Sequence, residues 1–381
     1  MQTGGGFFRP VSRPARDFGV LLARSLAAQR SLRVLDLMAG CGIRALRYGL
    51  EGGAASVWAN DADPDRRALL EANLGALGAS VQRRCTAQTA QRLLAELALS
   101  HDRHSFVDLD AFGCPTALLP AALEAVCLGG ILYLASTDGR SATGHDRGAA
   151  VRRFGAAVRA HPASWELALR LQIGAVARAA WALGRGVRPL LSFSEGRTFR
   201  TALRLERLPA VGEEGLLGLI AHCHGCGDQQ VQSLRCLGRW RTCRCGPDAP
   251  LAVSGPLWVG PLQDPASLEG MAVEAARSPV SLAPEGHRLL ERLRRDPGRE
   301  ARCWPTALIG RQLGCGPPPL EALVKALRAA GHQADASGVM AGQIRSDAPW
   351  SALLTIATSL GSGASRNERR GDPPAAAGPW P

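Results

Sequence analysis

The sequence predicts an α/β protein whose main domain contains a largely parallel sheet covered by helices. Between about residues 32 and 208, apolar runs of strand length alternate with longer amphipathic stretches, as in successive strand–helix–strand units. The chain has 381 residues, which is more than a typical single domain, and its composition changes after residue 208. We therefore expect smaller domains to follow the parallel sheet.

The elements of the main domain can be assigned in order from these runs. The segment 33–37 reads as the first strand, 43–50 as the helix after it, 56–60 as the second strand and 64–77 as the next helix. The later elements follow the same pattern of short apolar runs and long amphipathic ones. The expected later strands are 105–109, 130–135, 188–193 and 198–205, and the expected later helices are 117–127 and 165–183.

The remainder of the chain divides into three segments. Residues 209–265 are rich in glycine and cysteine, and residues 266–360 contain short helices at 284–295, 304–313 and 320–330. A hairpin-like segment, 332–345, follows these helices, an order that resembles a winged helix. Residues 361–381 consist mainly of Gly, Pro, Ala and Arg, and we expect them to form a disordered tail.

The charge of the chain favours a polyanionic partner. The net charge is +12, and Lys325 is the only lysine, so arginine supplies almost all of the positive charge. The planar guanidinium group matches phosphate, although a GC-rich genome that encodes arginine throughout would give the same composition. The sequence contains no uncharged apolar run long enough to span a membrane and no secretory signal pattern. A cytoplasmic location is therefore expected.

A glycine-rich turn follows the first strand and is a candidate cofactor loop. Gly40 and Gly42 would let the backbone approach a nucleoside closely, and the next helix would present free N–H groups. Asp61 ends the second strand, where a carboxylate can accept both hydrogen bonds of a ribose diol. A tight strand-to-helix turn with a solvated Asp61 explains the same residues, so the loop is a weak indication by itself.

The segment after the strand at 105–109 carries the candidate catalytic group. The exocyclic amine of a purine is a poor nucleophile, and a carboxylate beside it can orient it and accept its proton. Asp110 would be that carboxylate, and Phe112 would stack on a flipped base. Asp108 lies two residues earlier, so we interpret it as a deeper, buried hydrogen-bonding residue. The two loops together predict methylation of an amino group.

Four cysteines predict a zinc site between the two larger domains. Two residues separate Cys223 from Cys226, and Cys243 and Cys245 follow after sixteen intervening residues, close to the spacing of a zinc ribbon. The second pair is one residue short of that pattern. Cys236 could therefore replace Cys243 as the fourth ligand, and His222 or His224 could also take part. Unrelated free thiols are the alternative to a metal site.

These motifs, in order, resemble the tRNA (guanine-26-N2)-dimethyltransferase family over most of the chain. The glycine loop resembles the family's "ATGLRSIRY" element, and the segment around Asp110 resembles "DLDPFGSP". The segment after the cysteines and two segments near the end also resemble family elements. The matching segments are 8–11 with 16–17, 39–48, 60–61, 108–115, 255–262, 326–331 and 345–349.

The resemblance implies a fold, a reaction and binding residues. It implies a Rossmann-like class I methyltransferase domain over 1–208, a zinc-ribbon-like segment over 209–265 and a tRNA-binding domain over 266–360. The reaction would transfer one or two methyl groups from S-adenosylmethionine to the N2 atom of guanine 26, or also of a neighbouring guanine. We expect tRNA as the partner, and we expect neither a membrane nor an obligate protein partner. The implied cofactor-binding residues are Arg16, Gly40, Gly42, Arg44, Asp61, Thr86 and Ala87, with Asp110 and Phe112 as catalytic residues.

Two departures from the family pattern keep other functions open. Thr86 and Ala87 occupy the place where the family has Asp-Ala to meet the adenine, and Ala111 replaces a proline, which would loosen the catalytic loop. One alternative is a methyltransferase for another nucleic-acid amine, such as adenine N6. The other is a non-catalytic RNA-binding protein with a decayed cofactor site. A dehydrogenase is disfavoured because no proton relay accompanies the glycine loop.

Overall fold

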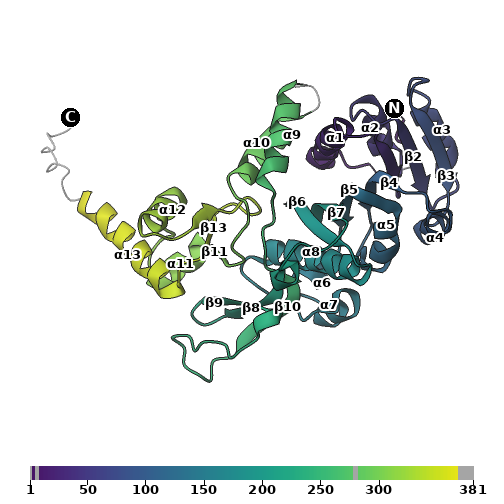
Figure 1. The fold of residues 1–381 in the computed structure, drawn as a ribbon. Helices are drawn as coiled ribbons and strands as arrows, with labels where there is room; N and C mark the ends of the chain where they lie inside the picture. Colours follow the sequence, from purple (N-terminus) through teal and green to yellow (C-terminus); the bar gives the residue numbers. More distant parts are fainter. Residues whose placement is uncertain (1, 5–7, 278–281, 368–381) are drawn as a thin grey trace, which may run out of the picture.

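A computed structural model describes residues 2–4, 8–277 and 282–367, with side chains described as far as residue 360. Three sheets divide the chain (Figure 1), and the largest lies in the first two hundred residues. The described helices include none that is long and apolar enough to cross a membrane.

The main sheet has seven strands in the order β3-β2-β1-β4-β5-β7-β6. Neighbouring strands from β3 to β5 are parallel, and β7 is antiparallel to both of its neighbours. The predicted parallel sheet is therefore confirmed. The strands are β1 (Arg33–Asp36), β2 (Ser56–Asp61), β3 (Gln82–Ala87), β4 (His104–Asp110), β5 (Val126–Ser136), β6 (Gly186–Glu195) and β7 (Thr198–Glu206).

Helices cover both faces of this sheet and bury two separate apolar clusters. One cluster joins α1 (Arg13–Ala27), α2 (Ile43–Leu50) and α3 (Arg66–Leu74) to the sheet, and the other joins α4 (Ala90–Ser100), α5 (Leu119–Ala125) and α8 (Ser164–Ala182) to it. Removal of apolar surface from water on both faces is the main stabilising contribution to such a layered fold. Short elements complete this region: η1 (Pro10–Ser12), η2 (Thr116–Leu118), α6 (Gly139–Ala142) and α7 (Arg147–Phe154).

The cysteine-rich segment forms a small antiparallel sheet in the order β10-β8-β9. Strands were not expected in this part of the chain, where the glycine content obscures the alternation of apolar residues. α8 packs against β10 and so attaches this sheet to the main domain. Its elements are η3 (Glu213–Leu216), β8 (Leu217–Cys223), β9 (Gln229–Ser233), η4 (Leu234–Cys236) and β10 (Leu251–Trp258).

The C-terminal unit has the order expected of a winged helix. A short strand is followed by two helices and a hairpin, and the first strand pairs with the last one to give the sheet order β11-β13-β12. A third apolar cluster lies within this unit. Its elements are β11 (Cys303–Pro305), α11 (Thr306–Leu313), α12 (Leu320–Ala329), β12 (Ala334–Ala336), β13 (Gln343–Ser346) and α13 (Trp350–Asn367).

Two expected boundaries differ from the structure. α9 (Pro265–Arg277) and α10 (Pro284–Arg294) pack on α1, and their buried leucines belong to the core of the main domain rather than to a domain beginning at 266. α13 continues to Asn367, so residues 361–367 are helical rather than part of a tail. Leu353, Leu354 and Ala357 anchor this helix, and each further residue then adds a backbone hydrogen bond. The rest of the expected tail, 368–381, lies outside the described residues.

A buried ionic cluster connects α8 to the C-terminal unit. Glu166 accepts hydrogen bonds from Arg170 and Arg345, and Arg345 also bonds both carboxylate oxygens of Asp296. Arg170 donates its remaining hydrogen bonds to backbone carbonyls of the segments 258–260 and 298–300. All four side chains are almost completely buried. The C-terminal unit is therefore oriented by charge pairing as well as by apolar contact.

Candidate active site and cysteine centre

The predicted cofactor loop lies at the carboxyl edge of the main sheet, between β1 and α2. Gly40 and Gly42 both have positive φ, 58° and 76°, a conformation that favours glycine. A Cβ atom on Gly42 would lie 2.9 Å from a methyl carbon of Leu70, so close packing of α3 also requires glycine there. The loop therefore follows from backbone geometry and helix packing as well as from any need to approach a ligand.

Asp61 lies at the end of β2, beside this loop. One of its carboxylate oxygens accepts a hydrogen bond from the Gly40 N–H at 2.8 Å, and the other accepts one from the Asp63 N–H at 3.0 Å. The side chain therefore fixes the loop to the neighbouring strand. Each oxygen keeps a lone pair, so the predicted contact with a ribose diol remains chemically available.

Thr86 and Ala87 end β3 and occupy the predicted adenine position. The Thr86 hydroxyl accepts a hydrogen bond from Trp58 Nε1 and donates one to Asn60 Oδ1, each at 2.8 Å. A hydroxyl has one hydrogen to donate, and this one is used within the protein. Thr86 therefore holds the ends of β2 and β3 together, and it cannot donate to a base without breaking that bond.

Two buried carboxyl groups lie beneath the edge. Asp36 accepts a hydrogen bond from the Ala45 N–H, and Asp108 accepts a 2.5 Å hydrogen bond from the Tyr48 hydroxyl. Burial, together with the neighbouring carboxyl group, raises the pKa of Asp36, and burial likewise raises the pKa of Asp108. Each residue has one oxygen without a hydrogen-bond partner among the described residues. Asp108 is thus the buried hydrogen-bonding residue that the sequence predicts.

Asp110 lies at the end of β4, where two arginines hold its carboxylate. Arg44 Nε lies 3.0 Å from Oδ2, and Arg200 Nη2 lies 3.3 Å from both oxygens. Burial opposes ionisation, but the guanidinium groups of Arg200 and then Arg44 lower the pKa of Asp110 to about 2. The Asp110 side chain still exposes 28% of its surface, so the ionised group can be reached from outside.

Arg200 was not recognised in the sequence. It lies in β7, ninety residues from Asp110 along the chain, and only 3% of its side chain is exposed. Its Nε atom also lies 3.5 Å from Glu195, whose other oxygen accepts the Ala15 N–H at the start of α1. The available indication was an arginine between Phe199 and Thr201 in an apolar strand, where a buried cation requires an anionic partner.

Arg44 and Arg16, which the resemblance implies as cofactor-binding residues, both bond other groups of the protein. Arg44 is buried between Asp108 and Asp110, so its charge is already paired. Arg16 donates to the backbone carbonyls of Arg9 and Pro10 and lies over the Phe8 ring. Burial lowers the pKa of Arg16 to about 10. In the protein alone, the first arginine supports Asp110 and the second fixes the N-terminal segment beside the site.

Phe112 is an exposed aromatic residue in the loop that follows β4. Its side chain is 93% exposed, which is unusual for a large apolar group. The next residue, Gly113, donates its N–H to Thr137 Oγ1 at 2.7 Å and accepts hydrogen bonds from Ser136 and Thr137. The loop is therefore attached to the end of β5, and the expected loosening by Ala111 is compensated at Gly113. Phe112 remains free to contact a planar ligand.

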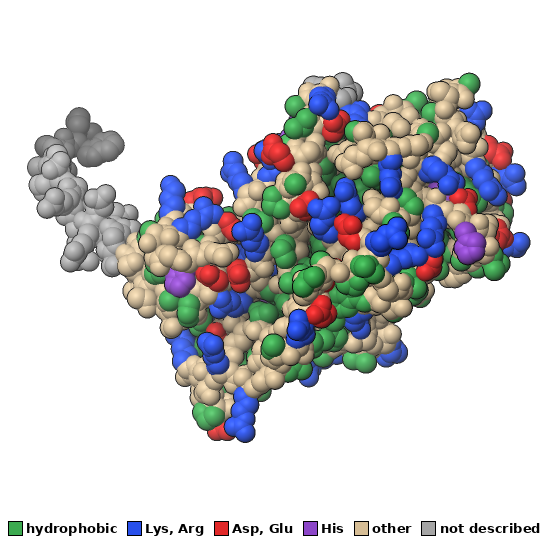
Figure 2. All heavy atoms as spheres, in the orientation of Figure 1, with side chains coloured by type: hydrophobic (Ala, Val, Ile, Leu, Met, Phe, Trp, Pro, Cys, Tyr) green, Lys and Arg blue, Asp and Glu red, His purple; other side chains and the backbone are tan. Residues whose placement is uncertain are grey.

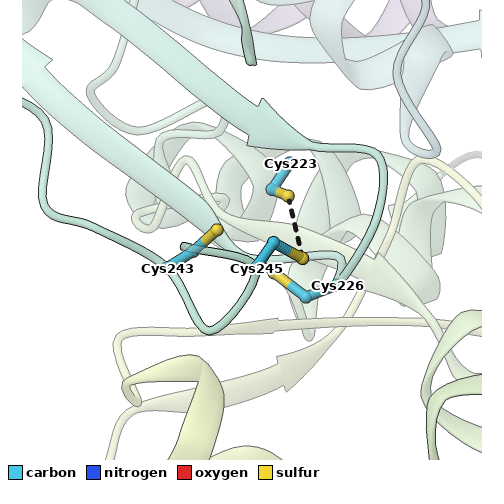
Figure 3. A group of neighbouring side chains, drawn as sticks. All are labelled: Cys223, Cys226, Cys243 and Cys245. Atoms are coloured by element: carbon cyan, nitrogen blue, oxygen red, sulfur yellow. Dashed lines mark hydrogen bonds between the residues drawn. The ribbon is translucent and has the colours of Figure 1, made fainter. Parts of the chain in front are cut away.

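The four predicted cysteines come together at the end of β8 (Figure 3). The sulfur atoms of Cys223, Cys226, Cys243 and Cys245 all lie within 4.8 Å of one another. Cys236 is exposed and lies outside this group, and neither His222 nor His224 belongs to it. The structure thus selects Cys243, rather than Cys236, as the fourth member.

The chemistry of this group fits a tetrahedral zinc ion. Zinc–sulfur bonds of about 2.3 Å place tetrahedral sulfur atoms about 3.8 Å apart, and the Cys223 and Cys245 sulfurs are 3.8 Å apart. A disulfide would require about 2.05 Å. Burial opposes ionisation, but a backbone N–H from Cys226 lowers the pKa of Cys223 to about 7. Burial and adjacent thiols raise the pKa of Cys226 to about 12. A bound zinc ion would favour the thiolate form of all four and balance their charge.

The cysteine turn also carries the C-terminal unit. Trp304 and Trp350 stack with ring centres 5.3 Å apart, and their indole N–H groups donate to the carbonyls of Gly227 and Cys226 at 2.8 Å. Gln312 donates to the Gly225 carbonyl at 2.9 Å. Each residue of the turn from 225 to 227 therefore provides a carbonyl to the C-terminal unit, so a metal that fixes the turn would also fix that unit.

Comparison with known proteins identifies relatives over the whole of this architecture. Residues 2–358 match the family model described as N2,N2-dimethylguanosine tRNA methyltransferase. The tRNA (guanine(26)-N(2))-dimethyltransferase of Thermococcus kodakarensis is 30% identical over 367 residues, 92% of each chain. The corresponding enzyme of Aeropyrum pernix is 30% identical over 372 residues, 93% of this chain and 90% of the relative.

A solved structure supports the same relationship. The complex of Trm1 from Pyrococcus horikoshii with S-adenosyl-L-methionine has a TM-score of 0.81 and 26% sequence identity to this chain. The match covers 92% of this chain and 94% of the other. It confirms the Rossmann-like methyltransferase fold and includes the small domains that follow the main sheet.

Proposed function

The chain belongs to the N2,N2-dimethylguanosine tRNA methyltransferase family, and on this premise we propose that it methylates the exocyclic N2 atom of guanine 26 in tRNA. One or two methyl groups would come from S-adenosylmethionine. The observation that carries the proposal is the ionised Asp110 carboxylate, held by Arg44 and Arg200, beside the exposed ring of Phe112.

The edge of the main sheet fits this cofactor. S-adenosylmethionine carries a ribose, an adenine and two positively charged groups in its amino acid part. Asp61 can accept hydrogen bonds from the ribose. Because the hydroxyl hydrogen of Thr86 is already used, recognition of adenine at Ala87 would rely on the backbone.

When bound, the cofactor supplies an electrophilic methyl group on a sulfonium. The task of the protein is to present a weakly nucleophilic amine, whose lone pair is delocalised into the guanine ring. Asp110 would accept a hydrogen bond from the amino group and orient its lone pair toward the methyl group. With a pKa of about 2, Asp110 is a poor base toward a neutral amine. It can accept the proton as positive charge develops on nitrogen during transfer.

Phe112 would hold the base against this carboxylate. A base inside a duplex cannot reach a recessed group, so enzymes of this kind rotate the nucleotide out of the stack. Stacking of a base on an aromatic ring contributes about 1–3 kcal/mol. Since Phe112 and Asp110 are two residues apart on one loop, the ring and the carboxylate would act on the same base.

The zinc ion has a structural role in this proposal. The four-cysteine group has no open position for a substrate, which is typical of structural rather than catalytic zinc. Cys223, Cys226, Cys243 and Cys245 would hold the ion and so fix the turn on which Trp304 and Trp350 pack.

The proposal is tested with purified protein, S-adenosylmethionine and an unmodified tRNA transcript. Digestion of the RNA and mass spectrometry should identify N2-methylguanosine or N2,N2-dimethylguanosine at position 26. A transcript with adenine at position 26 is the matched control and should remain unmodified. Methylation of adenine N6, or equal methylation of both transcripts, would contradict the proposal.

A further inference from the structure

The loop between β9 and β10 carries a concentration of unbalanced positive charge. We call residues 234–247 the arginine arm; it contains Arg235, Arg239, Arg241 and Arg244 and no acidic residue. Trp240 lies between the two central arginines. In Figure 2, basic side chains and some acidic atoms project from the lowest part of the molecule, where Figure 1 places the loop below β8 and β9; Asp248 follows the arm in this loop. This clustering is more specific than the general arginine content of the chain.

The central arginines of the arm differ from its outer ones in their pairing. Arg235 forms a 2.8 Å ion pair with Glu214, and Arg244 bonds Gln312. For Arg239 and Arg241, the described part of the chain offers no ion pair or side-chain hydrogen bond. Both side chains are exposed. An unpaired, exposed guanidinium group is available to an anion from outside.

The backbone of these two residues is nevertheless held in place. Gln230 accepts a hydrogen bond from the Arg241 N–H at 2.8 Å and donates one to the Arg241 carbonyl at 2.7 Å. Gln232 donates to the Arg239 carbonyl at 3.4 Å. Cys243 and Cys245 then hold the far end of the arm in the cysteine group. The unpaired guanidinium groups of Arg239 and Arg241 thus extend from a fixed backbone. Because that backbone is already ordered, less conformational entropy is lost when an anion binds.

The arm forms one wall of a groove whose other wall is the C-terminal unit. The groove encloses about 1030 Å³, and its lining includes Arg239, Arg241, Arg244 and, across from them, Arg302. Asp228, Glu300 and Asp347 also line it, where Asp228 accepts a hydrogen bond from Gln230 and Asp347 accepts one from the Gln333 N–H. The four arginines outnumber the three acidic residues of this lining, and of the four, Arg239 and Arg241 are the two whose guanidinium groups have no partner among the described residues.

We propose that the arginine arm is a phosphate-binding surface that holds the backbone of the tRNA substrate, with Arg239 and Arg241 as its contact residues. This inference rests on the proposed function, which makes tRNA the polyanionic substrate. Guanidinium groups pair with phosphate oxygens in bidentate geometry, and the contacts are independent of base sequence. The arm would contribute to affinity for tRNA and leave the chemical step at Asp110 unchanged.

The test uses two double variants. The arm variant carries both Arg239→Gln and Arg241→Gln, and the charge-matched control carries both Arg67→Gln and Arg92→Gln. The control arginines are exposed and pair with glutamates on their own helices, α3 and α4. The dissociation constant for tRNA transcript is measured at several salt concentrations. Each phosphate contact contributes roughly 0.7–0.9 to the slope of log K against log salt. In the arm variant, which lacks two contacts, the slope of log K against log salt should be smaller in magnitude by about 1.5. At 0.1 M salt this difference corresponds to an affinity for tRNA that is about 30-fold weaker.

Two further measurements make the result specific. The variant with lysine at both arm positions should recover most of the affinity, since phosphate contact requires charge. The rate at saturating tRNA should stay within about twofold of that of the unsubstituted protein. A salt slope equal to that of the control variant, while the unsubstituted protein still methylates guanine 26, would overturn the arm and leave the proposed function standing. Absence of any guanine methylation by the unsubstituted protein would overturn both.

Discussion

The active-site edge and the cysteine centre both gather charged or ionisable groups from distant parts of the chain, but they neutralise charge differently. At the edge, the carboxylates of Asp108 and Asp110 are balanced by Arg44 and Arg200 within the protein. At the cysteine centre, four thiols meet and the described residues supply no cation. The charges of the first site are balanced within the folded chain, whereas the second site fits a bound metal ion that would balance its thiolates.

The difference predicts two kinds of response to substitution. Loss of one group at the edge leaves a charge without a partner, and the pKa values of the remaining groups shift. Loss of one cysteine weakens the metal site. It also loosens the turn whose Cys226 and Gly227 carbonyls accept hydrogen bonds from Trp350 and Trp304. Rate and pH dependence should therefore report on the edge, and metal content and stability on the cysteine centre.

The largest effect is expected for Asp110→Asn. The amide keeps the shape of the side chain but loses the charge that orients and deprotonates the amine, so the rate should fall by roughly 10²–10⁴. Binding of S-adenosylmethionine, measured by calorimetry, should persist. Glu71→Gln, an exposed change on α3, serves as the control. Activity close to that of the unsubstituted protein would exclude Asp110 as the catalytic carboxylate.

The buried ionic cluster between α8 and the C-terminal unit also balances its charges within the protein. Its loss of one group should therefore also leave an unpaired charge, and the free energy of unfolding should fall. Glu166→Gln leaves Arg170 and Arg345 without their shared anion, and breaking such a pair costs about 3–5 kcal/mol. Urea unfolding should show this loss. The exposed change Glu285→Gln should alter stability by less than about 0.5 kcal/mol. An equal, small effect for both variants would show that the cluster contributes little to stability.

The same cluster predicts the acid limit of stability. Burial opposes ionisation of Glu166, but Arg345 and Arg170 lower its pKa from 4.5 to about 2. A depressed pKa stabilises the folded state above the unfolded value, and this stabilisation is lost as pH falls from about 4.5 toward 2. The difference in unfolding free energy between the unsubstituted protein and Glu166→Gln should therefore shrink over that range.

The variant Cys226→Ser should hold less zinc than the variant Cys236→Ser. Removing one of four ligands should weaken zinc binding by at least tenfold, since even outer contacts of metal ligands are worth 10- to 100-fold. Cys236 lies outside the group, so its loss should leave one zinc per chain. Elemental analysis of both purified variants checks this. Loss of zinc in the Cys236 variant would contradict the arrangement of the four sulfurs.

The smallest expected change is in the pH profile of Arg200→Gln. Arg200 lowers the pKa of Asp110 to about 2, so Asp110 should impose no acid limb on the rate between pH 5 and 8. Without Arg200 the pKa rises, and the acid limb moves upward toward that range. Arg200→Lys should keep most of the original profile. Identical profiles for all three proteins would show that Arg44 alone sets the pKa.

The local elements were predictable where apolar patterns were strong. The first helix after β1 was predicted with the bounds observed, and α8 within a residue at each end. β3 was missed because it is an edge strand whose residues are exposed or half buried, so it contains no apolar run. β9 was missed for a related reason, since four of its five residues are polar, and β8 and β10 each contain a glycine that interrupts the apolar pattern.

The sequence alone determined the class of fold and the presence of a cysteine group, and it pointed to the glycine loop and to Asp110 with Phe112 as the candidate site. The fold class follows from the alternation of apolar runs and amphipathic stretches, and the other features follow from residue types at close spacing along the chain. The tertiary structure decided that Arg200 pairs with Asp110, that Cys243 rather than Cys236 joins the sulfur group, and that Arg239 and Arg241 face a groove. These relations depend on how distant segments cross in space, and no spacing along a single chain encodes that distance.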